Sequence, residues 1–96
     1  MFTLKETAAL LKSELRRTFP GVKFSVTSSG WAFTSINVSW LGGPPATAVQ
    51  AVTARYERTT FGGAYGQDRV DTAHVLTAAD GRTARPGSDV VFLQPH

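Results

Sequence analysis

Cysteine is absent from this sequence of 96 residues, and its absence excludes several kinds of chemistry. The chain can form no disulfide bond, offers no thiolate ligand to a metal and has no cysteine nucleophile. No apolar run reaches the length of a membrane span. The first residues also lack the basic region of a secretory signal peptide. We therefore expect a cytoplasmic protein that does not enter a membrane.

Charge is missing from the middle of the chain, because residues 24–54 contain no charged side chain. The formal net charge is +3, and it resides in the first 23 residues, where five basic residues outnumber two acidic ones. The segment from residue 55 onward has five of each sign. A basic N-terminal segment can bind nucleic acid or an acidic partner. It can also be the solvated face of a helix, and the sequence leaves both interpretations open.

Two segments have the pattern of helices. Residues 3–18 begin with Thr3 and Glu6 at the spacing of a capping box. Leucine and alanine then recur at i, i+4, i+7 and i+11, which predicts one apolar stripe. A Phe-Pro-Gly sequence ends this helix. Residues 45–57 begin with the second of two prolines and carry Ala48, Val49, Val52 and Tyr56 on one side, which predicts a second helix.

Alternation of apolar and polar residues predicts strands. It covers residues 22–27 and 32–40, which are separated by a short Ser-Ser-Gly turn and therefore predict a β-hairpin. The outer face of this hairpin should be rich in polar groups, from Ser25, Thr27, Ser35, Asn37 and Ser39. A weaker alternation over residues 69–77 and an apolar run over 89–94 predict one or two further strands. Residues 58–66 are predicted to form a glycine-rich loop.

The predicted fold class is α+β, with the element order α-β-β-α-(β)-β. Two helices are expected to pack on one face of a small antiparallel sheet, because each apolar stripe needs a surface to cover. The length allows one hydrophobic core, so residues 1–96 are predicted to form a single domain.

Three runs carry a resemblance to a known family. They are ELRRTFPGVKFSV at 14–26, SINVSW at 35–40 and SDVVF at 88–92, with a Gly-Pro step before the second helix. Together they resemble the large polyvalent protein-associated domain family, type twenty-nine, over about residues 3–94. The resemblance implies an α+β module of phage, plasmid and conjugative-element proteins. It implies no established enzymatic role and no catalytic residues.

His74 is the residue on which catalysis or metal binding would have to rest, with Asp68 and Asp71 nearby in sequence. In a strand, His74 and Asp71 would point to opposite faces of the sheet. Too few other ligands accompany them to form a metal site. The sequence also lacks the Gly-x-Ser-x-Gly elbow of a hydrolase. We therefore predict a protein that is not an enzyme and holds no metal or cofactor.

Aromatic residues near the predicted hairpin turn and the glycine-rich loop are the candidate partner contacts. They are Trp31, Phe33, Phe61 and Tyr65. Aromatic side chains beside an uncharged surface are typical of protein interfaces. The leading hypothesis is a small non-enzymatic binding module of phage or mobile-element type that binds a protein, with host and defence factors among the candidates. A second copy of the chain, in a homodimer, is a further candidate.

The alternative hypothesis is a nucleic-acid-binding module. It would use the basic face of the first helix and the residue that follows it, through Lys5, Lys12, Arg16 and Lys23. Salt separates the two hypotheses, because contacts to phosphate weaken steeply with ionic strength whereas an apolar interface responds little.

Overall fold

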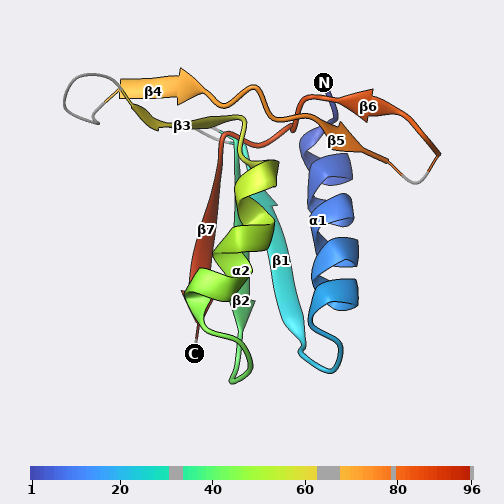
Figure 1. The fold of residues 1–96 in the computed structure, drawn as a ribbon, viewed down its shortest axis with the longest axis vertical. Coiled ribbons are helices and arrows are strands. Elements are labelled where there is room, and N and C mark those ends of the chain that lie inside the picture. Colours follow the sequence, from blue (N-terminus) through green and yellow to red (C-terminus); the bar gives the residue numbers. More distant parts are fainter. Residues whose placement is uncertain (31–33, 63–67, 79, 96) are drawn as a thin grey trace.

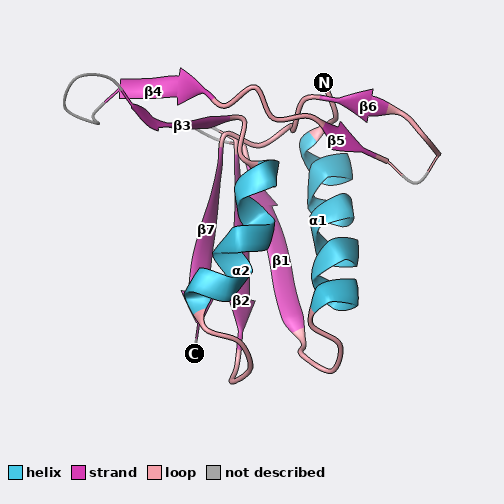
Figure 2. Cartoon of the chain, viewed as in Figure 1, coloured by secondary structure: helices cyan, strands magenta, loops and turns pink. Residues whose placement is uncertain are grey.

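The computed structural model describes residues 1–30, 34–62, 68–78 and 80–95. Its elements begin with the helix α1, the hairpin strands β1 and β2, the helix α2 and the short 3₁₀ helix η1 (Figures 1 and 2). Strands β3 to β7 follow. The bounds are α1 Leu4–Thr18, β1 Phe24–Ser29, β2 Ser35–Trp40, α2 Ala46–Thr53, η1 Ala54–Tyr56, β3 Thr59–Gly62, β4 Asp68–Asp71, β5 Leu76–Thr77, β6 Thr83–Ala84 and β7 Val90–Pro95. The predicted α+β class is confirmed.

Helix α1 begins where the sequence predicts. The Thr3 hydroxyl accepts the Glu6 N–H at 3.1 Å, and the Glu6 carboxylate accepts the Thr3 N–H at 3.1 Å. This capping box satisfies two backbone donors that a helix start leaves without partners. Leu11 and Leu15 on the predicted stripe are fully buried.

The main sheet has three strands in the order β1-β2-β7. β1 and β2 pair antiparallel as the predicted hairpin, with Val26 opposite Val38. β7 pairs with β2 in the parallel direction, so the sheet is mixed. The direction follows from where β7 starts. α2 returns the chain to the end of the sheet where β2 begins, and strands β3 to β6 lie across that same end before β7 (Figure 1). A strand that starts from there must run alongside β2.

Both helices lie against the same face of this sheet (Figure 2). The buried side chains that fill the space between them come from the helices, from alternate positions of β2 and from the N-terminus. They include Phe2, Leu11, Leu15, Ile36, Val38, Trp40, Val49, Val52 and Tyr56. Trp40 also satisfies its indole N–H, which donates to the carbonyl of Pro44 at 3.0 Å.

A second layer, which we call the crown, consists of the hairpin pairs β3–β4 and β5–β6. It lies across one end of the helices and the main sheet (Figure 1). The prediction of one strand over residues 69–77 is wrong, because β4 and β5 belong to different pairs. Ala73 adopts a positive φ of 61°, and the hydroxyl of Thr72 donates to the carbonyl of Glu57 at 2.8 Å. These two features turn the chain between the strands. The predicted loop at 58–66 is also corrected, since its first half forms β3.

Polar contacts join the crown to the rest of the molecule. The Arg58 guanidinium pairs with Asp89 at 2.6 Å, and the Thr34 hydroxyl donates to the same carboxylate at 3.2 Å. Arg85 donates to the carbonyls of His74 at 2.9 Å and Arg58 at 3.1 Å. Multivalent arginines of this kind can satisfy carbonyls that short strands leave unpaired. The crown is therefore held by polar contacts as well as by apolar packing, since Leu76 of β5 is buried in the core and Ala84 of β6 packs against it.

Candidate interaction surface

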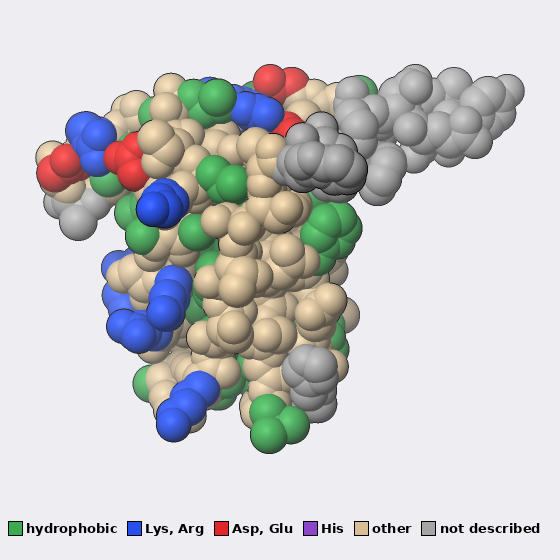
Figure 3. Space-filling model, turned by 180° about the vertical axis from the view of Figure 1, so that it is seen from behind, with side chains coloured by type: hydrophobic (Ala, Val, Ile, Leu, Met, Phe, Trp, Pro, Cys, Tyr) green, Lys and Arg blue, Asp and Glu red, His purple; other side chains and the backbone are tan. Residues whose placement is uncertain are grey.

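Among the described residues, no helix lies over the face of the main sheet opposite α1 and α2 (Figures 1 and 3). Six of its positions form two rows across the three strands. They are Ser25, Ser39 and Gln94 in one row and Thr27, Asn37 and Phe92 in the other. We call these six residues the open sheet face. None of them is charged, and the surface in Figure 3 shows neither blue nor red over the middle of the sheet.

The sequence predicts most of this face but not all of it. Ser25, Thr27, Asn37 and Ser39 lie on it as expected. Ser35 was expected there as well, but only 6% of its surface is exposed. The apolar run that contains Phe92 suggests a strand buried on both sides, yet the Phe92 side chain is 46% exposed. Its register opposite Asn37 places it on the open sheet face, a position that could be inferred only once β7 was known to pair with β2.

A column of basic side chains borders this face on the α1 side. Lys5, Lys12 and Arg16 are spaced at i, i+7 and i+11, so they share one flank of the helix. Lys23 lies just before β1, and all four side chains are exposed. None of the four takes part in an ion pair among the described residues. Figure 3 shows basic side chains along the margin of the uncharged surface that lies on the α1 side. We call Lys5, Lys12, Arg16 and Lys23 the basic column.

The aromatic residues that the sequence proposes as partner contacts are only partly located. Trp31, Phe33 and Tyr65 lie outside the described residues. Phe61 belongs to the backbone of β3, opposite Arg69, and its side chain is not described. The structure thus brings none of these four into a described surface, whereas it brings Phe92 into one.

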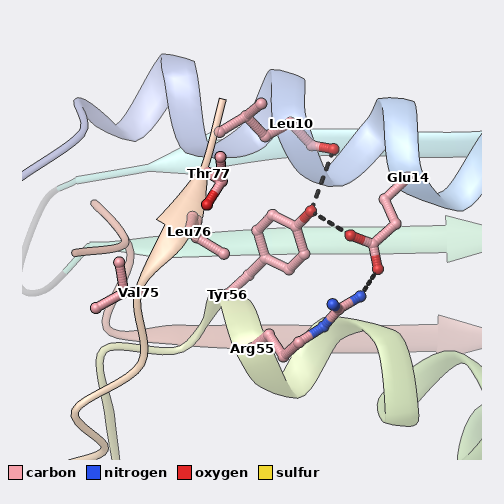
Figure 4. Close-up of a pocket in the computed structure, with 7 residues that line it drawn as sticks. All are labelled: Leu10, Glu14, Arg55, Tyr56, Val75, Leu76 and Thr77. Carbon is pink, nitrogen blue, oxygen red and sulfur yellow. Dashed lines mark hydrogen bonds and ion pairs between the residues drawn. The ribbon is translucent and has the colours of Figure 1, made fainter. Parts of the chain in front are cut away.

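A small pocket of about 200 Å³ opens between α1, η1 and β5. Tyr56 stands at its centre and donates its hydroxyl to Glu14 at 2.9 Å, with the Leu10 carbonyl at 3.4 Å (Figure 4). Arg55 forms an ion pair with the same carboxylate. Burial raises the pKa of Tyr56, so its hydroxyl keeps its proton and remains a donor. These hydrogen bonds and the ion pair link α1 to η1. Because the polar groups of the pocket bind one another, we assign the pocket a structural role.

His74 is held by the backbone. Its Nδ1 lies 3.2 Å from the carbonyl oxygen of Glu57. Asp71 points to other partners, since it accepts the Ala73 N–H at 2.6 Å and pairs with Arg85. Within the described residues, no group of three or more histidine, aspartate or glutamate side chains could hold a metal ion. His74 and Asp71 therefore form no acid–base pair in this structure.

No helix among the described residues is long and apolar enough to cross a membrane. No curated protein and no solved structure gives a significant match to the chain. A family model does match, and it is described as large polyvalent protein associated domain 29. It spans residues 2–94, which include both helices, the main sheet and the crown. The chain therefore belongs to the large polyvalent protein associated domain 29 family.

Proposed function

We propose that this phage-type domain is a non-enzymatic binding module that docks a protein partner on its open sheet face. The observation that carries the proposal is the absence of charge from all six residues of that face. The centres of protein interfaces are depleted in charged residues, whereas nucleic-acid interfaces are strongly basic.

The composition of the open sheet face fits such an interface. Phe92 supplies an aromatic side chain of the kind that dominates binding energy. Ser25, Thr27, Asn37 and Ser39 extend the face from Phe92 across β2 and β1 with short side chains that can donate and accept hydrogen bonds. Short side chains lose little conformational entropy when a partner covers them. Covering this face with a partner therefore costs little conformational entropy, which favours its use as a docking surface.

Binding of nucleic acid through the basic column is the second candidate. Lys5, Lys12, Arg16 and Lys23 have no acidic partner among the described residues, so their charge is available to phosphate. This candidate and the first predict opposite responses to a cation placed on the open sheet face. Such a cation would strengthen binding of nucleic acid and would disrupt an uncharged protein interface.

The experiment is a pull-down with tagged protein from nuclease-treated host lysate at low and at high salt, repeated with the variant Thr27→Arg. The control is Gln50→Arg, which adds the same charge to an exposed position of α2. The proposal expects one protein that is retained at high salt by the native protein and by the control, and that is lost by Thr27→Arg. Retention of that protein by Thr27→Arg, or capture of nucleic acid alone, would contradict it.

A further inference from the structure

The two edges of the main sheet differ in what they leave open. On β7, the Val91 N–H donates to the Glu57 carboxylate at 3.1 Å, so it does not pair within the sheet. Pro95 lies four residues after Val91 and therefore faces the same outer side of the strand. As a proline, it has no backbone N–H to donate. Side-chain caps and proline are two ways in which proteins close a sheet edge. The β7 edge is therefore closed at two of its three outward positions.

The β1 edge has no such closure in the part of the chain that the structure describes. A strand directs the N–H and C=O groups of alternate residues to its two sides, and β2 takes one of these two sets. Among the described residues, no hydrogen bond from outside the hairpin reaches the backbone of Phe24–Ser29. The strand also contains no proline and no charged residue. Its outward groups are therefore positioned to pair with one further strand.

The basic column sets the chemistry of that strand. Leu11 and Leu15 point α1 into the core, and Arg17 lies on the α2 side, where its charge acts on Tyr56. Helix geometry puts Lys12 and Arg16 on the other flank of α1. Figure 1 shows α1 beside β1, and Figure 3 shows basic side chains along that margin of the sheet. Lys12 and Arg16 are about 6 Å apart along the helix. Alternate side chains of a strand are about 6.6 Å apart, so carboxylates at every second position would match them.

We propose that the β1 edge takes up an extended acidic segment of the partner as a fourth strand. This inference rests on the proposed function and adds the binding mode and the chemistry of the partner. A second copy of this chain is a poorer occupant. Pairing of β1 with β1 of another copy would bring two basic columns to one seam, where like charges repel.

The test uses isotopically labelled protein and a synthetic peptide of about eight residues that alternates valine with glutamate. Amide hydrogen exchange is followed by NMR as the peptide is added. The expected result is that the peptide slows amide exchange at every second residue of 24–29. Amide exchange in β7 should stay unchanged. Lys12→Glu and Arg16→Glu should each weaken peptide binding about tenfold, whereas the matched control Arg17→Glu should leave it unchanged.

Three results would overturn the inference. The first is peptide binding without alternate protection in β1. The second is the same protection produced by a short single-stranded oligonucleotide instead of the peptide. The third is protection that rises with protein concentration in the absence of peptide, which would identify a second copy as the occupant. If the peptide fails while Thr27→Arg still abolishes capture of a protein, the proposed function stands and only strand addition fails.

Discussion

The two faces of the main sheet come from the same strands and have opposite roles. On the face covered by the helices, Ile36 and Val38 are fully buried and Trp40 is 3% exposed. On the open sheet face, Asn37 and Ser39 alternate with them, and both helices lie on the other side of the sheet (Figure 2). Burial of apolar surface drives folding, whereas an exposed polar face contributes little to it. The covered face therefore determines the fold, and the open face is free to determine binding.

The first prediction concerns the covered face and should have the largest effect. Trp40→Ala removes a buried indole that packs against Phe24, with the ring centroids 5.7 Å apart, and it breaks the hydrogen bond to Pro44. We expect a loss of about 3–5 kcal/mol in the free energy of unfolding. Denaturant titration measures it. The matched control Ser39→Ala changes the adjacent residue on the open face. Equal losses from both variants would remove the distinction between the faces.

The second prediction tests the buried polar contact between α1 and the segment that joins the crown to β7. Thr7 is fully buried, its hydroxyl donates to the Thr3 carbonyl at 2.8 Å, and it accepts the Gly87 N–H at 2.7 Å. Thr7→Val leaves the Gly87 N–H without a partner, which should cost about 1–3 kcal/mol. Thermal unfolding and amide exchange near Gly87 measure the effect. The control is Thr18→Val, an exposed position in the same helix. A loss no larger than that of the control would show that the hydroxyl is dispensable.

The third prediction concerns pH. The pKa of Asp71 lies below its ordinary value because the Ala73 N–H donates to its carboxylate, and that of Asp80 is lowered in the same way by the Arg82 N–H. A carboxyl group whose pKa is lower in the folded state adds stability above its unfolded pKa. That stability is lost as the pH falls through the folded pKa. We expect constant stability near neutral pH and a decline below about pH 4.

The crown should respond to acid first, since these carboxylates lie in it, whereas Ile36, Val38 and Trp40 on the covered face of the sheet have no titratable side chain. Amide exchange measured as the pH is lowered should therefore rise in β5 and β6 before it rises in β2. The variant Asp71→Asn should flatten part of the decline. Simultaneous exposure of β2 and β5 at every pH would contradict this order.

The difference between the two layers also explains what the sequence can predict. The helix cap at Thr3 and the hairpin of β1 and β2 depend on neighbours in the chain and on a clear period, and both are predicted correctly. The crown is missed because its strands are short and because the arginines beside them bind groups far away in the chain, as when Arg58 pairs with Asp89 and Arg85 donates to the carbonyl of His74. Such contacts cannot be predicted from the local pattern of apolar and polar residues.

The candidate surface follows the same division. The polar positions of β1 and β2 can be read from alternation, but Phe92 joins them only through the parallel pairing of β7, which depends on the whole path of the chain. The basic column is predictable from the helix period at Lys5, Lys12 and Arg16. The position of the basic column beside an unpaired sheet edge cannot be predicted from the sequence, because the order of the strands is a property of the whole fold.

The fourth prediction concerns the smallest expected change in the free energy of unfolding. Thr27→Val and Ser25→Ala alter exposed side chains of the open face that make no hydrogen bond among the described residues. We expect each to change the free energy of unfolding by no more than about 0.5 kcal/mol. Denaturant titrations at matched protein concentration measure this. A loss above about 1 kcal/mol would show that this face takes part in folding.

The most direct measurement compares stability and binding in one variant, Asn37→Arg, with Gln50→Arg as the control. Asn37 lies in the central strand of the open face between Thr27 and Phe92. The account predicts that both variants unfold within a few degrees of the native protein, about 4 °C at most. It also predicts that only Asn37→Arg fails to retain the protein partner at high salt. Retention of the partner by a folded Asn37→Arg would contradict the assignment of binding to the open sheet face.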